Sequence, residues 1–370
     1  MHQTREPCPQ PLTLRQRKNH LPHDIILNIL ARLPVKSVLR FRCIYKTWDS
    51  PISTPKFIST HLNNNNNNKD HFCFISKVIY DSSVSEKTYY TVASMFNRIS
   101  KYPIPSDFDL LSVKLVGSCS GLFCVAEYKN HDWFAEVIYL WNPCIRKFKR
   151  LPDFCLRQYN RNAIGFACQS DTNDYKVVRL CVPNNVNLPK VESEVYRLSS
   201  DSWRRVTMSL RPNVVVSYID PFWPATFVSE ALHWLVDVKE GERQFLHQSM
   251  ILSFDVNVIN LERYHSLMDV VYRVLEEYGV HELWNKLFSV QLENVSSFLD
   301  CTRYGELIVL KVVEAKSKVG EFPNWNNLAV VSIDPETLHE KDIGVHYRPT
   351  TATTFVESLV LLDGANGLSG

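Results

Sequence analysis

The sequence contains no long hydrophobic run. No apolar stretch among its 370 residues approaches the roughly 18 to 20 residues that span a bilayer. The first twenty residues also lack the apolar core of a secretory signal. We therefore expect a protein without membrane association, located in the cytoplasm, the nucleus or both.

Motifs for metal, phosphate and dinucleotide binding are absent as well. The 12 histidines form no H-E-x-x-H pair and the 10 cysteines form no C-x-x-C pair. The sequence has neither G-x-x-x-x-G-K-[ST] nor G-x-G-x-x-G. We expect no metal site and no cofactor. The cysteines are scattered, and Cys124 and Cys181 lie inside apolar runs, which favours buried free thiols over disulfides.

One short stretch imitates a catalytic motif. Gly117–Gly121 reads GSCSG and resembles a nucleophile elbow with Cys119 as the nucleophile, so a cysteine hydrolase is one hypothesis. An elbow needs a helix after the nucleophile, whereas the following residues, LFCVAEY, favour a strand. We interpret GSCSG as a tight turn between strands, with both glycines at positive φ, and expect no catalytic residue.

Charge is divided unevenly along the chain. The net charge of +2 combines a balance of +7 over residues 1–62 with −5 over the rest. This asymmetry predicts an acidic partner for the N-terminal part. The basic residues lie on a strongly apolar segment without interleaved aromatic residues that stack on bases, which argues against nucleic acid.

That basic segment has helical periodicity. Ile25, Ile26, Ile29, Leu30 and Leu33 share one side of a helix that begins near Pro22 and ends before Pro34. A second short helix follows, because Val35, Val38, Leu39 and Arg42 repeat the i, i+3, i+4, i+7 spacing. Two helices of this length have more apolar surface than they can bury between themselves. The surplus must dock on the rest of the chain or bind another protein.

After six consecutive asparagines, Asn63 to Asn68, the period changes to two. Four segments each run from a strand through a polar turn to a second strand: YLWNPCIRKFKRLP, EVYRLSSDSWRRVT, LSFDVNVINLERYHSL and VVSIDPETLHEKDIG. Each follows other strand-like runs, such as GLFCVAEY and YKVVRLCV. Repeated units of four strands predict a β-propeller, with a large β-sandwich as the alternative.

These residues resemble a known family. Residues 21–62, LPHDIILNILARLPVKSVLRFRCIYKTWDSPISTPKFISTHL, resemble the F-box, and the remainder resembles the F-box-associated domain of plant F-box proteins through GSCSGLFCV, WNPCIRKFKRLP, IGFACQSDTNDYKVVRL and EYGVHELWNKLF. The resemblance implies a small all-α F-box of three helices followed by a large all-β, propeller-like domain. We place a disordered basic tail at 1–20, the F-box at 21–62, an asparagine-rich linker at 63–71, the β domain at 72–364 and a flexible C-terminus at 365–370.

The resemblance also implies a function. Such a protein is the non-catalytic substrate receptor of a Skp–cullin–F-box ubiquitin ligase, in which the F-box binds a Skp-family adaptor, the adaptor binds cullin, and the β domain holds a target protein. The implied adaptor-binding residues are Leu21, Pro22, Ile25, Ile29, Leu30, Leu33, Pro34, Val38, Leu39, Arg42, Ile44 and Trp48. In the alternative role, each of these side chains packs inside the F-box.

Three positions depart from the family's pattern. Tyr45 stands where a cysteine is usual, Asp49 where a basic residue is usual, and Pro51 where a leucine is usual. A proline inside the third helix would weaken it. These departures motivate an alternative function, a β-propeller binding module that acts outside the ligase, including a role like that of a self-incompatibility receptor.

Two tryptophans are candidates for target binding. Trp223 and Trp325 stand in loop-like stretches, DPFWPAT and EFPNWNN, whereas the other tryptophans are expected in the core. The identity of the target is not encoded in any motif we recognise.

Overall fold

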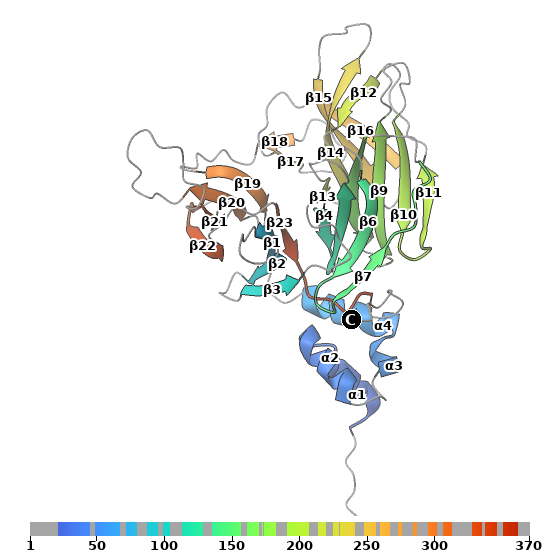
Figure 1. Cartoon of the computed structure of the whole chain (residues 1–370), viewed down its shortest axis with the longest axis vertical. Coiled ribbons are helices and arrows are strands. Elements are labelled where there is room, and N and C mark those ends of the chain that lie inside the picture. The colour runs from blue at the N-terminus through green and yellow to red at the C-terminus, as the bar shows by residue number, and fades with distance from the viewer. Residues whose placement is uncertain are drawn as a thin grey trace, which may run out of the picture.

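The computed structural model describes most helices and strands of the chain. The described residues are 21–44, 49–66, 72–79, 87–94, 99–103, 113–128, 135–156, 161–169, 172, 174–182, 191–206, 214–219, 225–228, 230–240, 248–256, 260–266, 273–275, 284–286, 295–301, 306–312, 328–334, 337–345 and 351–361. Helices lie at one end of the molecule, and β-sheets form the rest (Figure 1). This arrangement confirms the predicted fold class.

The helical unit contains α1 (His23–Leu30), α2 (Val35–Ile44), α3 (Asp49–Ile52) and α4 (Pro55–Asn66). The carbonyl of Pro22 accepts hydrogen bonds from the N–H groups of Ile25 and Ile26 at 3.1 and 3.2 Å, so α1 begins directly after this proline. α1 and α2 lie where the periodicity predicts them, on the two sides of Pro34.

The predicted third helix is divided in two at Thr54. Pro51 lies in the first turn of α3, where a backbone N–H has no partner within the helix, so its missing donor costs little. The Thr54 hydroxyl oxygen accepts a hydrogen bond from Phe57 N–H at 3.2 Å and caps α4, whose first residue is Pro55. The chain therefore accommodates Pro51 by ending one helix and starting another.

α4 continues into the asparagine run. The first four asparagines of the predicted linker, residues 63–66, are helical. Asn64 Nδ2 donates to the carbonyl oxygen of Ala31 at 3.1 Å, a tertiary hydrogen bond that compensates for the low helix propensity of asparagine. The prediction of a linker was wrong for these four residues, and residues 67–71 lie outside the described part of the chain.

In the described part of the chain, the strands form five larger sheets and one small one. The first sheet has the order β23 (Thr351–Phe355), β1 (Phe72–Ile79), β2 (Lys87–Ser94) and β3 (Ile99–Pro103). The second contains β4 (Val113–Cys119), β5 (Leu122–Tyr128), β6 (Ala135–Asn142) and β7 (Lys147–Arg150). The third contains β8 (Arg161–Gln169), β9 (Asp174–Val182), β10 (Glu192–Arg197) and β11 (Ser202–Val206).

The fourth sheet contains β12 (Val214–Ile219), β13 (Thr226–Val228), β14 (Ala231–Glu240), β15 (Gln248–Asp255) and β16 (Asn260–Ser266). β17 (Arg273–Leu275) and β18 (Trp284–Lys286) form a pair. The last sheet contains β19 (Val295–Cys301), β20 (Leu307–Val312), β21 (Leu328–Ile333) and β22 (Glu340–Val345). All four predicted strand–turn–strand segments are therefore hairpins, namely β6–β7, β10–β11, β15–β16 and β21–β22.

One strand of each larger sheet lies next to the neighbouring sheet. β23 contacts β19 on one side and β4 on the other, β4 contacts β8, and β8 contacts β13 and β14. β23 comes from the C-terminal region and pairs with β1, so the last strand completes the first sheet (Figure 1). This is the order of a β-propeller. Over the described residues, the sheets do not close into a full ring.

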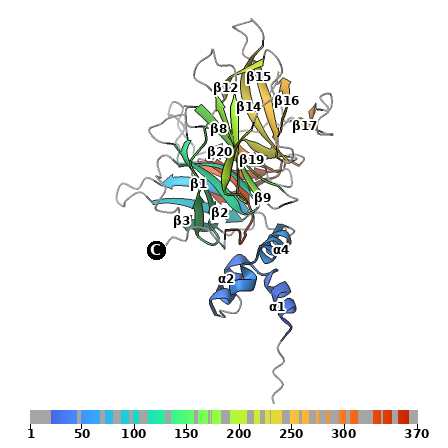
Figure 2. The same ribbon diagram turned by 90° about the vertical axis from the view of Figure 1, so that its right-hand side faces the viewer.

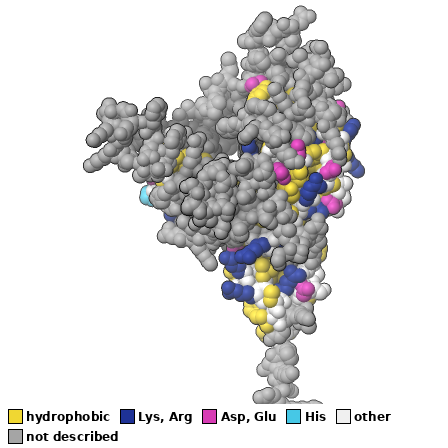
Figure 3. All heavy atoms as spheres, in the orientation of Figure 1, with side chains coloured by type: hydrophobic (Ala, Val, Ile, Leu, Met, Phe, Trp, Pro, Cys, Tyr) yellow, Lys and Arg dark blue, Asp and Glu magenta, His cyan; other side chains and the backbone are white. Residues whose placement is uncertain are grey.

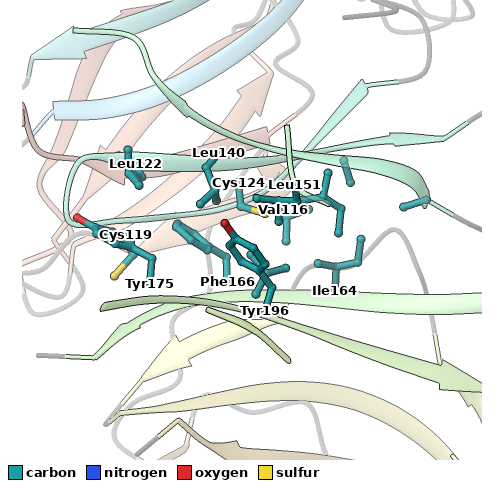
Figure 4. Close-up of a cluster of buried hydrophobic side chains, with 14 of the residues drawn as sticks. Val116, Cys119, Leu122, Cys124, Leu140, Leu151, Ile164, Phe166, Tyr175 and Tyr196 are labelled. Atoms are coloured by element: carbon teal, nitrogen blue, oxygen red, sulfur yellow. The ribbon is translucent and has the colours of Figure 1, made fainter. Parts of the chain in front are cut away.

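The contact between the second and third sheets shows how the core is built. Val116 and Leu140 from one sheet face Ile164, Phe166 and Tyr196 from the other (Figure 4). Alternating strand positions supply these side chains, as the period of two requires. Three of the predicted core tryptophans, Trp141, Trp203 and Trp234, are buried.

A buried ion pair lies at the edge of this core. Arg179 and Glu194 are both fully buried and form a salt bridge. Glu194 Oε2 also accepts hydrogen bonds from the N–H groups of Cys155 and Leu156 at 3.0 and 3.1 Å. The guanidinium of Arg179 donates to Leu156 O at 2.9 Å and lies over the ring of Phe154, 4.1 Å from its centroid. The pair thereby fixes the connection between the second and third sheets.

We expect Glu194→Gln to destabilise the protein by about 3 to 5 kcal/mol, because it leaves the charge of Arg179 buried without a counter-charge. The matched control is Asp153→Asn, at an exposed pair whose Arg150 Nη2 lies 3.3 Å from Asp153 Oδ1. The control should change stability by less than about 1 kcal/mol. Urea unfolding followed by tryptophan fluorescence measures both. Equal midpoints for the two variants would contradict the role given to the buried pair.

Candidate functional site

The helical unit exposes most of the large apolar side chains that the described surface presents. Six such side chains are exposed, and five of them lie on or just before α1 and α2. They are Leu21 (57% exposed), Ile25 (48%), Ile29 (47%), Phe41 (42%) and Ile44 (67%). The concentration of apolar surface on two short helices is typical of a protein-binding site.

On α1 the exposed apolar side chains form one row. Ile25 and Ile29 are four residues apart and lie on the same side of the helix, and Leu21 lies two residues before the helix begins. The opposite side of the helix ends in Leu30, which is buried. The local sequence therefore produces a helix with two apolar sides, one exposed at Ile25 and Ile29 and one buried at Leu30.

The second helix adds two exposed apolar residues. Phe41 and Ile44 are three residues apart and share a side of α2, whereas Val35 and Val38 are buried. Sequence reasoning missed Phe41, because it lies off the stripe formed by Val35, Val38 and Arg42. Its spacing from Ile44 was the available signal.

Positive charge surrounds this apolar surface. Arg32, Lys36 and Arg40 have exposed side chains, and Lys and Arg side chains lie beside apolar ones on the helical unit in Figure 3. Arg42 forms an ion pair with Asp49, and the two side chains are 28% and 54% exposed. Asp49, one of the departures from the family pattern, thus holds Arg42 between α2 and α3.

The predicted adaptor-binding residues divide by burial. Leu21, Pro22, Ile25, Ile29, Pro34 and Ile44 are exposed, Leu33, Leu39 and Arg42 are partly buried, and Leu30 and Val38 are buried. Trp48 and Tyr45 lie outside the described residues, as do Trp223 and Trp325. The structure therefore brings six of the predicted side chains to the surface and uses two in the core.

The inner side of the helical unit joins the sheets. One continuous cluster of buried apolar side chains contains Leu30, Val35 and Phe57 from the helices and Trp141 and Phe355 from the sheets. His61 of α4 is buried nearby, and its Nε2 lies 2.9 Å from Leu33 O. Burial lowers the pKa of His61 from 6.5, with the hydrogen bond to Leu33 acting in the opposite direction. The neutral ring is therefore favoured in the folded protein. The free energy of unfolding decreases as the pH falls below 6.5, because the unfolded chain then binds a proton at His61 more readily than the folded protein does.

The stretch GSCSG is a turn, as predicted. It joins β4 and β5, which form an antiparallel hairpin, and no helix follows Cys119. The positive-φ residues are Ser120 (44°) and Gly121 (83°). The expectation that Gly117 has positive φ was wrong. Gly117 instead lies within β4 at an irregularity in the pairing, where its nearest neighbour is Phe166.

Cys119 forms a disulfide with Cys168, the penultimate residue of β8. The expectation of free thiols was wrong for these two cysteines and is confirmed for Cys124 and Cys181, which are free and buried. The two bonded cysteines are 49 residues apart, so their spacing in the sequence resembles no disulfide motif. The bond links the second sheet to the third, and a bonded sulfur is not available as a nucleophile.

The described residues lack two features that other kinds of function would require, a metal-binding cluster and a membrane-spanning helix. They contain no group of three or more His, Cys, Asp or Glu side chains placed to hold a metal ion. None of the described helices has both the length and the apolar character needed to cross a membrane.

Comparison with known proteins identifies two families of domains. The profile of the F-box associated beta propeller domain matches residues 71–273, more than half of the chain, and that of the F-box domain matches residues 19–50. An F-box/kelch-repeat protein of Arabidopsis thaliana is 30% identical over 224 residues, 58% of this chain and 58% of that protein. A putative F-box protein of the same plant is 29% identical over 230 residues, 61% of this chain and 56% of that protein.

The chain thus spans less than two thirds of the length of these relatives. Among solved structures, the Dos1 propeller is 9% identical with a TM-score of 0.33, over 74% of this chain and 75% of that one. A structural similarity with a TM-score this low does not indicate a shared function.

The disulfide predicts the pattern of thiol labelling. In protein purified without reductant, we expect an alkylating reagent to modify the exposed Cys43 and Cys155 and to leave Cys119 and Cys168 unmodified until a reductant is added. Cys181 should react slowly under both conditions, because burial raises its pKa to about 12. Peptide mass spectrometry reads out each site. Labelling of Cys119 without reductant at the rate of Cys43 would refute the disulfide.

Proposed function

Because this chain belongs to the plant F-box proteins that have an F-box associated beta propeller domain, we propose that it is the substrate-recognition subunit of a Skp–cullin–F-box ubiquitin ligase. In this proposal the helical unit binds a Skp-family adaptor, the adaptor binds cullin, and the sheets hold a target protein. The chain itself is non-catalytic. It raises the effective concentration of the target near the ubiquitin donor.

The exposed apolar surface of α1 and α2 is the observation that carries this proposal. Leu21, Ile25 and Ile29 are exposed with no covering segment among the described residues, and Phe41 and Ile44 add to this surface on α2. Exposure of five large apolar side chains costs free energy in an isolated protein. Binding of an adaptor would remove their surface from water, and the surrounding basic residues would match an acidic adaptor.

Two of the departures from the family pattern, Asp49 and Pro51, lie in the described residues and leave this surface exposed. Pro51 lies in the first turn of the short helix α3, and Asp49 pairs with Arg42. The physical reason for proposing a module outside the ligase was a proline within a long third helix. The division between α3 and α4 removes that reason, so we favour the ligase subunit.

We expect Ile25→Asp and Ile29→Asp each to weaken binding of the adaptor by roughly 30-fold or more, because each places a carboxylate in a desolvated apolar contact. Leu338→Asp is the matched control, since Leu338 is the sixth exposed apolar side chain and lies in the turn before β22, away from the helices. The control should bind like the wild type. Calorimetric titration of the full chain with a purified Skp-family adaptor, followed by co-purification with cullin, measures these effects.

Pro51→Leu tests the competing function in the same assay. Binding within about threefold of wild type is expected, because Pro51 costs the helices little. If only Pro51→Leu binds the adaptor, the ligase proposal fails and the binding module is favoured. If the wild type and Pro51→Leu both fail to bind, the adaptor proposal is also wrong.

The target-binding role of Trp223 and Trp325 remains a proposal. Each aromatic side chain in a loop can supply a large contact area, so Trp223→Ala and Trp325→Ala should reduce target capture about tenfold while adaptor affinity stays unchanged. Quantitative mass spectrometry of proteins that co-purify from plant extract compares the variants with the wild type and with Leu338→Ala. Identical sets of captured proteins would refute the role of both tryptophans.

A further inference from the structure

The segment after the last strand contacts parts of the chain that are distant in sequence. β23 ends at Phe355, and residues Val356–Leu361, here called the C-terminal segment, leave the sheet and run beside α4 (Figure 1, Figure 2). The segment has no regular secondary structure, yet Ser358, Leu359 and Leu361 are buried. Irregular backbone in the interior needs specific hydrogen bonds, and these come from the second sheet.

Asn142 supplies most of these hydrogen bonds. Its Nδ2 lies 3.0 Å from Ser358 O, 3.1 Å from Ser358 Oγ and 2.9 Å from Val360 O, and its two N–H groups are shared among these three acceptors. Its Oδ1 accepts from Cys144 N–H at 3.0 Å, which fixes the orientation of the amide. Asn142 and Ser358 are 216 residues apart and both fully buried. One side chain at the end of β6 therefore binds the backbone of the C-terminal segment.

Gly121 provides the space for this contact. The Ser358 hydroxyl donates to Gly121 O at 3.3 Å. A Cβ atom at Gly121 would overlap the side chain of Ser358 and lie 2.8 Å from Val356 O. The GSCSG turn thus has a glycine where the C-terminal segment leaves no room for a side chain. This gives the turn a structural role that its similarity to a nucleophile elbow did not suggest.

The other side of the segment belongs to the apolar cluster shared with the helices. Phe355 and Leu359 lie in that cluster together with Leu30 and Phe57 of the helical unit. Phe355 also stacks on Phe123 of β5, with ring centroids 4.7 Å apart. The segment therefore lies between the sheets, which bind it by hydrogen bonds, and the helices, which share its apolar contacts.

We propose that the C-terminal segment fixes the orientation of the helical unit relative to the sheets, with Asn142 and Ser358 as positioning residues. The helical unit and the second sheet also share the apolar cluster that contains Leu30 and Trp141. Apolar contacts are non-directional, whereas the hydrogen bonds from Asn142 hold the segment in one position. The inference rests on the proposed function in one respect. A fixed orientation holds a target at a constant distance from the ubiquitin donor, which maximises its effective concentration there.

The test measures the orientation directly and does not need the target. Nitroxide labels are attached to p-acetylphenylalanine introduced at Asn28 of α1 and Ser202 of β11, two exposed positions, in the full chain with its cysteines unchanged. Pulsed electron paramagnetic resonance then gives the distribution of distances between the labels. Three variants disturb the C-terminal segment: two substitutions and one truncation. One of the substitutions and the truncation each have a matched control.

Asn142→Asp keeps the acceptor for Cys144 N–H but places a carboxylate oxygen against the carbonyls of Ser358 and Val360. Gly121→Ala adds a Cβ where Ser358 lies, and its control is Gly117→Ala, where a Cβ would meet only Phe166 Cβ at 3.7 Å, an ordinary contact. A chain ending at Phe355 lacks the segment, and its control ends at Leu361. Thermal unfolding verifies that each variant folds.

We expect one narrow distribution for the wild type and both controls, and a distribution about twice as wide or wider for the three variants. Adaptor affinity should stay within about twofold of wild type in all of them, because the exposed row on α1 is unchanged. If Asn142→Asp and Gly121→Ala fold and their distance distributions are as narrow as that of the wild type, the proposal is wrong. If one variant does not fold, the other two decide. Failure of the wild type to bind the adaptor would refute the proposed function and leave this measurement valid.

Discussion

The structure depends on one continuous apolar cluster that the helices and the sheets share. Leu30, Val35 and Phe57 pack into it from one side, and Trp141 and Phe355 from the other. Because the inner sides of α1 and α2 are buried there, Ile25 and Ile29 on the outer side of α1 face away from the sheets. The same packing therefore creates the surface that we assign to the adaptor and determines where that surface lies relative to the β domain.

Local patterns were sufficient to predict α1, α2 and the four strand–turn–strand hairpins. The spacing of Ile25, Ile29 and Leu30 predicts α1, and the change to a period of two predicts the strands, because helix and strand periods depend on neighbouring residues alone. Repeated strand–turn–strand segments then predicted the propeller-like order. The resemblance to F-box proteins supplied the proposed function, which no periodicity contains.

Contacts between distant residues were beyond such reasoning. Cys119 and Cys168 are separated by 49 residues, and Asn142 and Ser358 by 216, so no local pattern links either pair. The prediction of a linker at residues 63–66 failed for a similar reason. The hydrogen bond from Asn64 to the carbonyl of Ala31 joins residues that are distant in sequence, and it overrides the weak helix propensity of asparagine. At GSCSG, the sequence showed two glycines, and the positive φ of Gly121 together with the approach of Ser358 distinguishes it from Gly117.

The pairing of β1 with β23 also has a consequence for biosynthesis. A ribosome releases β1, β2 and β3 early, yet β1 has no partner on its other side until residues 351–355 have been translated. During that interval the nascent chain presents an open strand edge to its surroundings, which is the kind of surface that chaperones bind and that aggregation uses. A premature stop codon anywhere before β23 would make this state permanent. Messages truncated near their 3′ end should therefore yield a polypeptide recognised by quality control.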